Sequence, residues 1–264
     1  MTTPAPLRLA ILTVVRNDCT GLADTYDSLR GQLGPGIVWL VADGASTDGT
    51  AEWLMDHADV PLWWRSARDS GLYDAMNDAL AAAGRLGCSH VLFLNAGDRL
   101  AEPDSGMRLL RAIARHPDCA LLYGDALERL GDGRILLKRA RSHRWATLGM
   151  FTHHQAMIYS VSALAGLRFD SGYRIAADYD FTLSVLKRGR AERLHWPVCL
   201  FAAGGLSQRD ATAGRHEQTA IRQRHFSHGA IHAAMIAMAQ RVALALRHRL
   251  PALYAKLRFR CPEI

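Results

Sequence analysis

Continuous apolar runs alternate with amphipathic segments along the first 100 residues, and this order constrains the fold more than any other feature. The apolar runs, typical of strands buried on both faces, are 8–15, 36–42, 61–65 and 90–94. The segments between them, with apolar residues at helical spacing, are 21–32, 50–57 and 72–83. Such alternation predicts an α/β fold: a mostly parallel central sheet with helices on both faces.

Polar loops follow three of these predicted strands. The loops are 16–18, 43–48 and 95–98. In parallel sheets ligands bind at the carboxyl ends of the strands. We therefore expect a binding site where these loops meet.

The second half of the chain has shorter apolar runs. Residues 120–140 read as a hairpin that turns at 131–133. Strands are expected at 153–159 and 193–201, and a helix with an acidic start at 175–187. From about residue 217 the composition is helical, so we expect a domain of residues 1–216 and a basic amphipathic helical tail of residues 217–264.

The positive charge of the chain is concentrated in that tail. Between Ile221 and Arg260 there are eight Lys or Arg and no acid, whereas the whole chain carries +7. A basic helix with an apolar stripe favours an anionic membrane surface. A solvated helix packed on the body is the second interpretation, and nucleic acid is not expected as a partner. A transmembrane span is not expected, because polar residues interrupt the apolar stretch 229–246.

Cysteine usage and the amino terminus bear on localisation. The five cysteines are scattered and form no C-x-x-C pair, which favours reduced thiols over disulfides or structural zinc. Residues 1–9 lack the features of a signal peptide. Together with the tail, these features predict a cytoplasmic protein peripheral to the inner face of the plasma membrane.

Carboxylates in the strand-end loops provide the candidate chemistry. Asp43 directly follows a strand and could accept hydrogen bonds from a base or a ribose. Asp98 could ligate the Mg²⁺ or Mn²⁺ that a nucleotide diphosphate requires, and Asn95 could donate or accept hydrogen bonds beside it. The competing interpretation of both loops is ordinary turn and capping chemistry, which we favour for Ser46 and Thr47.

A third acidic segment opens the predicted helix at 175–187. A carboxylate at the start of a helix can act as a base that accepts the proton of an attacking hydroxyl. Asp178 and Asp180 are candidates, and because they point in different directions on a helix only one can serve. Alternatively, either acid only charges the helix amino terminus.

Six segments in order give these loops a specific resemblance. They are TVVRN from Thr13, VADGASTDGT from Val41, DSGLYDAMNDAL from Asp69, FLNAGD from Phe93, HHQAMIY from His153 and YRIAADYDF from Tyr173. With the segment 201–207 they resemble the family 2 inverting glycosyltransferases of the GT-A fold, most closely the bacterial surface-polysaccharide branch (colanic acid, capsule and O-antigen type). The similarity covers roughly residues 9–208.

The resemblance implies a role for each matching residue. The implied donor-binding residues are Thr13, Val15, Asn17, Asp43, Asp69, Gly71, Asp74 and Asn95, with Asn77 bracing the helix. Asp98 matches the last acid of the family's metal-binding D-x-D, and Asp178 matches its catalytic base. The implied activity is sugar transfer, of hexosyltransferase type, from a nucleotide-diphosphate donor to an acceptor hydroxyl, with a lipid-linked glycan as acceptor if the tail binds membrane.

Two departures from the family pattern accompany the match. The D-x-D segment retains one acid, Asp98, and Ala177 replaces the glutamate beside the base. His153 and His154 are equally compatible with ligand contact and with burial. A sugar nucleotidyltransferase and an inactive membrane-associated scaffold are the alternative functions, whereas a dehydrogenase is disfavoured because no G-x-G-x-x-G follows the first strand.

Overall fold

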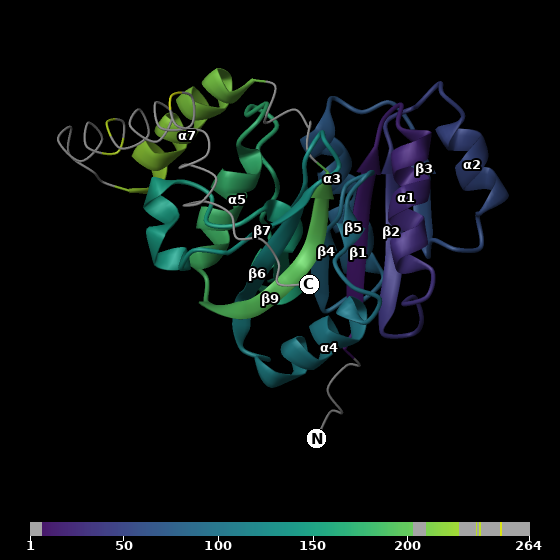
Figure 1. Ribbon diagram of the computed structural model, residues 1–264, viewed down its shortest axis with the longest axis horizontal. Coiled ribbons are helices and arrows are strands. Elements are labelled where there is room, and N and C mark those ends of the chain that lie inside the picture. Colours follow the sequence, from purple (N-terminus) through teal and green to yellow (C-terminus); the bar gives the residue numbers. More distant parts are fainter. Residues whose placement is uncertain (1–6, 203–209, 227–235, 237, 239–248, 250–264) are drawn as a thin grey trace.

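The structure is a computed structural model that describes residues 7–202, 210–226, 236, 238 and 249. Within these residues a nine-stranded sheet has the order β3-β2-β1-β4-β8-β6-β9-β5, and β7 pairs with β6 (Figure 1). The pairs of β1, β2, β3 and β4 are parallel, as are β6 and β9. The expectation of a mostly parallel central sheet is confirmed.

The first half follows the predicted order closely. Its elements are β1 (Leu9–Val15), α1 (Cys19–Leu29), β2 (Ile37–Asp43), α2 (Thr50–Asp56), β3 (Trp63–Ser66), α3 (Leu72–Arg85) and β4 (His90–Phe93). Helix α1 begins two residues before the predicted start, because the Asp18 side chain accepts a hydrogen bond from the Gly21 amide at 3.0 Å.

The second half contains one helix and one strand that we did not expect from the sequence. Its elements are β5 (Arg99–Leu100), α4 (Ser105–Arg115), β6 (Cys119–Arg129), β7 (Ile135–Lys138), β8 (Met157–Ser160), α5 (Ala177–Leu186), β9 (Arg190–Ala202) and α7 (Ala211–His225). Strand β5 and helix α4 are the unexpected elements. The predicted hairpin is confirmed, since β6 and β7 pair antiparallel around the turn at 130–134.

The predicted strand 153–159 is wrong in its first half. Residues His154–Ala156 form a single 3-10 turn, closed by a hydrogen bond from the Ala156 amide to the His153 carbonyl at 3.0 Å. Only Met157–Ser160 pair as a strand, antiparallel to β4 and β6. Strand β8 therefore separates the two parallel parts of the sheet.

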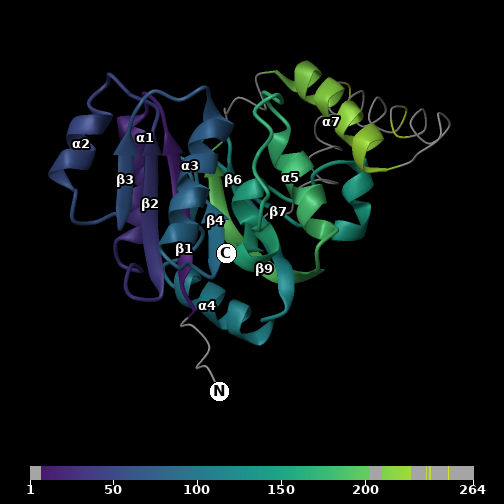
Figure 2. The ribbon, with the colours of Figure 1, turned by 180° about the vertical axis from the view of Figure 1, so that it is seen from behind.

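The sheet divides the core into two apolar clusters. Alternate residues of β1 face opposite sides: Ala10 and Leu12 join the cluster under α3 and α5, whereas Leu9 and Ile11 join the cluster under α1 and α4. Helix α1 covers the face seen in Figure 1, and α3 covers the face seen from behind in Figure 2. Helices on both faces, as expected, explain why the strands are apolar on both sides.

The carboxyl-terminal segment is described only in part. Helix α7 spans the domain boundary expected at residues 216 and 217, and it packs along α5. No helix in the described residues is long and apolar enough to cross a membrane. Apart from Ile236, Met238 and Arg249, the expected tail after Phe226 lies outside the described residues.

Candidate active site

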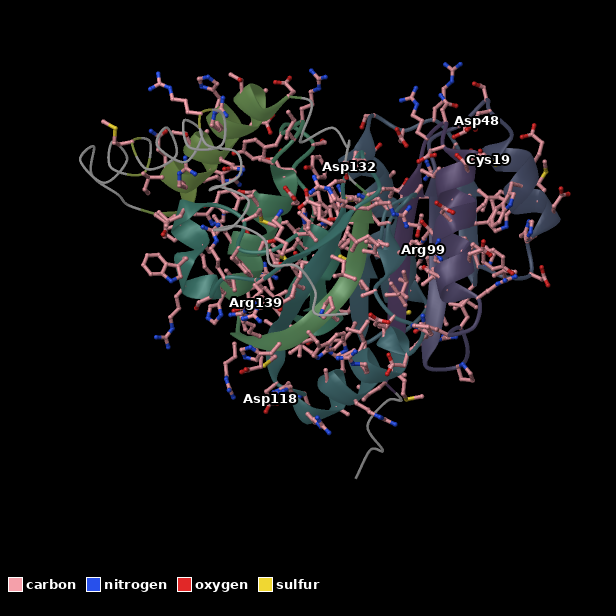
Figure 3. All side chains as sticks on the ribbon, viewed as in Figure 1. Cys19, Asp48, Arg99, Asp118, Asp132 and Arg139 are labelled. Carbon is pink, nitrogen blue, oxygen red and sulfur yellow. The ribbon has the colours of Figure 1, made fainter. Side chains whose placement is uncertain are left out.

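The expected loops lie at one edge of the sheet. Val15, the last residue of β1, pairs with Asp43, the last residue of β2, and the neighbouring β4 runs in the same direction. Figure 3 shows Cys19 and Asp48 at this end of the strands and Asp118 at the opposite end. The parallel register thus brings together the loops that follow β1, β2 and β4.

Hydrogen bonds connect the first two of these loops. The Asn17 amide donates to the Ser46 hydroxyl at 2.7 Å, and the Asn17 side-chain oxygen accepts from the Thr47 amide at 2.8 Å. One turn further on, the Cys19 amide donates to Asp48 at 2.9 Å. Asn17 adopts a positive φ of 52°, a conformation that asparagine tolerates better than most residues. Ser46 and Thr47 therefore connect the two loops, and neither hydroxyl caps α2; the Asp48 side chain instead accepts from the amide of Thr50, its first residue, at 3.2 Å.

Asp43 is almost fully buried at the tip of β2. Its carboxylate accepts hydrogen bonds from the amide and hydroxyl of Ser46 and from the hydroxyl of Ser66. These donors fix the orientation of the carboxylate before any ligand arrives. Thr13 is more deeply placed: its hydroxyl donates to the Leu94 carbonyl at 2.7 Å and accepts from the Trp39 indole at 2.9 Å.

The start of α3 approaches the same edge. A Cβ on Gly44 would stand 2.7 Å from a carboxylate oxygen of Asp69, so the absence of a side chain permits this approach. Asp69 accepts from the Gly71 amide at 3.0 Å, and Gly71 has a φ of 134° that favours glycine. Asp74 accepts from the Ser70 amide at 3.0 Å, and bonds from Ser70 lower the pKa of Asp74. Asp69, Gly71 and Asp74 thus form one turn beside Asp43.

Asp98 is buried after β4, at the position expected to hold a metal. Burial raises the pKa of its carboxyl to about 7, against the opposing effect of the Ala202 amide, which donates to it at 2.9 Å. Asp98 directly precedes β5 and Ala202 is the last residue of β9, so this bond extends the antiparallel pairing of β5 with β9. A bound cation would offset the cost of ionising a carboxyl in this position.

The neighbouring Asn95 supports the same use of this loop. Its side-chain oxygen is buried and finds no hydrogen-bond partner in the described part of the chain. The described residues contain no cluster of three or more His, Cys, Asp or Glu that could hold a metal. Mg²⁺ and Mn²⁺ in nucleotide sites, however, commonly use one or two protein oxygens together with substrate phosphates and water. Asp98 and Asn95 fit such a substrate-bridged cation.

Asp178 lies in the first turn of α5 and is only partly exposed. Burial raises the pKa of its carboxyl to about 6, against the effect of the hydrogen bond from the Tyr179 amide at 2.9 Å and of the nearby Tyr73 hydroxyl. The Tyr73 hydroxyl donates its hydrogen to the Ile175 carbonyl at 2.6 Å and lies beside Asp178. Because Tyr73 belongs to α3, two residues after Gly71, this pair of contacts joins Asp178 to the turn beside Asp43. A carboxylate with a pKa near 6 is suited to accept a proton at neutral pH.

Asp180, the other candidate base, has a different environment. It is buried, and its carboxylate bonds to His225 of α7 at 2.7 Å. Asp180 therefore connects two helices, and the described contacts separate its role from that of Asp178.

The two adjacent histidines also differ. His154 is buried, stacks on Phe93 at 4.9 Å between ring centroids, and burial lowers its pKa to about 3, so it stays neutral. His153 contacts Glu128 at 3.2 Å and Lys138 at 2.8 Å. His153 and Lys138 hold the pKa of Glu128 at about 2, although burial opposes this. His154 therefore packs the core, whereas His153 belongs to a charged cluster.

Sequence patterns did not point to three residues of this region: Tyr73, Gln155 and Glu217. Tyr73 and Gln155 lie inside the quoted segments, and each lowers the pKa of an expected acid, Asp178 and Asp98 respectively. Glu217 accepts hydrogen bonds from the backbone just before α5. The one available signal for Glu217 was its isolation, since no other acid lies between Asp210 and Glu263.

Relatives that carry the name glycosyltransferase resemble this chain over most of its length. An uncharacterised glycosyltransferase of Mycobacterium tuberculosis is 30% identical over 221 residues, which cover 80% of this chain and 81% of the relative. The chain belongs to the glycosyltransferases. A PGL/p-HBAD biosynthesis glycosyltransferase of Mycobacterium bovis is 28% identical over 200 residues, covering 68% and 69% of the two chains. No protein-family model matches the sequence.

Solved structures show that this glycosyltransferase has the GT-A-like fold that the resemblance implied. TarS of S. aureus in complex with UDP-GlcNAc superposes with a TM-score of 0.65 at 16% identity, over 91% of this chain and 73% of that one. A mannosyltransferase of Pyrobaculum calidifontis in complex with GDP-Man and Mn²⁺ gives 0.61 at 18% identity, over 94% and 73%.

A cavity of about 680 Å³ lies elsewhere on the glycosyltransferase, between β6, the start of β9 and the carboxyl-terminal end of α5. Its lining includes Tyr123, Lys187 and Arg193 but none of the expected site residues. The candidate active site is therefore defined by the carboxyl edge of the strands and the start of α5, and not by this cavity.

Proposed function

We propose that this glycosyltransferase inverts: it transfers a sugar, of hexosyl type, from a nucleotide-diphosphate donor to an acceptor hydroxyl, with Asp178 as the base. The observation that carries the proposal is the state of Asp178. Its carboxyl is desolvated, its pKa is raised to about 6, and it opens a helix beside the polar edge of the sheet. As the acceptor hydroxyl attacks the anomeric carbon from the face opposite the leaving group, Asp178 accepts its proton and the nucleoside diphosphate departs.

The donor occupies the carboxyl edge of β1, β2 and β4 in this proposal. The residues assigned to it are Thr13, Val15, Asn17, Asp43, Asp69, Gly71, Asp74 and Asn95. Thr13 and Val15 would act through the backbone of β1, because the Thr13 hydroxyl is engaged in the core and the Val15 side chain is buried. The structural neighbours bound to UDP-GlcNAc and to GDP-Man support a nucleotide sugar as donor.

A divalent cation, Mn²⁺ or Mg²⁺, fits beside Asp98. Asp98 and Asn95 are the residues that would hold it, for the reasons of burial and unmatched oxygen given above. When bound, such a cation neutralises negative charge on the departing diphosphate. The complex of the P. calidifontis mannosyltransferase with Mn²⁺ supports this assignment.

The acceptor and location follow from the basic tail. We propose membership of family 2, in its bacterial surface-polysaccharide branch, with residues 1–216 as the catalytic domain and 217–264 as the tail. Eight Lys or Arg without an acid between 221 and 260 favour an anionic membrane surface, and the location proposed on this basis is the inner face of the plasma membrane. The proposed acceptor is then a lipid-linked glycan, because it lies at the same membrane surface.

The donor assignment is tested first by thermal shift. The full-length protein is screened against UDP-, GDP- and dTDP-sugars with and without Mn²⁺; a donor at 100 times its Kd should add about 2.7 kcal/mol of stability. The stabilising donor is then incubated with acceptors, and NMR reads the anomeric configuration of the product. Inversion is the expected result, and retention would refute Asp178 as a base that acts on the acceptor.

Two further assay results would indicate one of the alternative functions. Release of pyrophosphate from a nucleoside triphosphate and a sugar phosphate would indicate a nucleotidyltransferase. Binding of a nucleotide sugar without transfer to any acceptor would indicate an inactive scaffold.

The tail is tested by co-sedimentation with phosphatidylglycerol and phosphatidylcholine vesicles. We expect binding to the anionic phosphatidylglycerol vesicles, and we expect salt to weaken this binding. Equal binding to both kinds of vesicle would refute an electrostatic role.

A further inference from the structure

A single carboxylate on α7 accepts hydrogen bonds from three successive backbone amides. The Glu217 side chain receives the amide of Arg174 at 2.8 Å, that of Ile175 at 2.9 Å and that of Ala176 at 2.8 Å. These residues directly precede α5, whose second residue is Asp178. Hydrogen bonds to an ionised carboxylate are shorter and stronger than those to neutral acceptors. The backbone that leads into the proposed base is therefore held by a charge from another helix.

Helix α7 packs against this backbone at close range. A Cβ on Gly214, one turn before Glu217, would stand 3.2 Å from Cγ2 of Ile175, closer than most real contacts. The absent side chain lets α7 come near enough for Glu217 to reach the amides. The approach is thus built from two residues of α7 that face the same three-residue segment.

The other end of α7 is also attached to α5. His225 bonds to Asp180 at 2.7 Å, and the Lys187 ammonium donates to the His225 carbonyl at 3.0 Å. The two helices lie side by side in both Figure 1 and Figure 2. Glu217 therefore acts from a helix that is anchored along the length of α5.

We propose that Glu217 is the positioning residue of the base: its carboxylate fixes the backbone of residues 174–176 and thereby the place of Asp178 at the start of α5. The inference rests on the proposed function for its catalytic consequence, whereas its structural part concerns three amides and stands by itself. It makes the first turns of the carboxyl-terminal region part of the catalytic apparatus.

The charge of Glu217 has a second effect on Asp178. In the described residues Asp178 interacts with Tyr73 of α3, which lowers its pKa, with Glu217 of α7, which raises it, and with Tyr159 of β8, whose own pKa it raises. Loss of the Glu217 charge should therefore lower the pKa of Asp178. A role limited to packing would not move this pKa.

The structural part is tested by hydrogen–deuterium exchange of the amides of residues 174–176 in the full-length protein. In Glu217→Ala these amides should exchange about tenfold faster or more, because each loses a charge-assisted bond. Asp210→Ala is the matched control. Asp210 caps α7 through the Ala213 amide at 3.2 Å, so its loss weakens the same helix but keeps Glu217.

Glu217→Gln keeps the size of the side chain and one acceptor oxygen, so intermediate exchange is expected; it also carries the test if Glu217→Ala does not fold. The proposal is supported if the amides of residues 174–176 exchange faster than in wild type in both Glu217 variants, and if they exchange more slowly in Asp210→Ala than in those variants. Exchange at 174–176 that is unchanged in the Glu217 variants, or equally fast in Asp210→Ala, overturns it.

The catalytic part is read from the pH dependence of transfer. Glu217→Gln should lower kcat, by up to about 100-fold if the base moves by about 1 Å. The donor KM should change little, and the acidic limb of the pH profile should move to lower pH. Asp210→Ala should leave the limb in place. If Glu217→Gln leaves kcat and the acidic limb unchanged while the amides of residues 174–176 exchange faster, Glu217 does not position the base. If the wild-type protein transfers no sugar, the proposed function fails, whereas the exchange result still tests the structural part.

Discussion

Replacement of Asp178 by Asn should abolish transfer and, at the same time, stabilise the protein above neutral pH. The general base contributes about 100- to 10,000-fold to rate, so kcat should fall by that factor. Nucleotide binding should persist, because none of the residues assigned to the donor is changed. Few other substitutions would be expected to remove activity and raise stability together.

The stability gain follows from the pKa of Asp178, which burial raises from 3.8 to about 6. A carboxyl whose pKa is raised in the folded state stabilises the protein below the unfolded pKa, and this contribution is lost as pH rises through about 6. A shift of about 2 units corresponds to roughly 3 kcal/mol at most. Asn carries no charge to desolvate, so Asp178→Asn should be more stable than wild type by about 2 kcal/mol at pH 8, and equally stable near pH 4.

Thermal unfolding at pH 4, 6 and 8 measures this difference, and for a protein of this size about 2 kcal/mol corresponds to roughly 4 to 8 °C in Tm. Asp180→Asn is the matched control. It replaces the ionised acceptor of the 2.7 Å bond to His225 with a neutral amide oxygen, so it should lower Tm yet leave a base in place. A Tm for Asp178→Asn that lies at or below wild type at pH 8, or transfer at the wild-type rate, would refute the reasoning.

Two further substitutions test neighbouring residues. Asp98→Ala should remove Mn²⁺-dependent nucleotide binding in calorimetry. In wild type the dependence of nucleotide binding on Mn²⁺ should weaken from pH 8 to pH 6, because protons compete for a carboxyl whose pKa is about 7. Nucleotide binding that is unaffected by the substitution and by pH would contradict a cation at this position. Tyr73→Phe removes a hydroxyl whose proximity lowers the pKa of Asp178, so the acidic limb of the rate profile should move to higher pH. The Ile175 carbonyl loses its donor, which should cost about 1 to 2 kcal/mol of stability. A limb that moves to lower pH would show that Tyr73 does not stabilise the ionised base.

The edge of the sheet could be predicted because its position follows from strand direction. Asp43 and Asp98 each follow an apolar run, and parallel strands bring such positions to one side. Their partners could not be predicted in the same way. Asp98 bonds to the Ala202 amide, and no local pattern relates two positions 104 residues apart.

Helix α4 and Glu217 escaped prediction for different reasons. Helix α4 could have been predicted, because its buried residues Leu109, Ala112 and Ile113 fall at helical spacing and its three arginines lie between them. Glu217 lies in a basic segment whose sequence predicts a surface helix, whereas the amides that donate to its carboxylate lie 41 to 43 residues earlier in the chain. Long-range partners of single side chains are set by tertiary packing, which periodicity does not record.

The bonds from Asn17 to Ser46 and Thr47, and from Cys19 to Asp48, have a consequence for engineering. The two loops hold each other's backbone, so neither can be lengthened, shortened or exchanged without leaving the other's polar groups unmatched. Attempts to transplant donor preference from a related enzyme should move both segments as one unit, and a chimera that takes only one should lose solubility before it changes specificity.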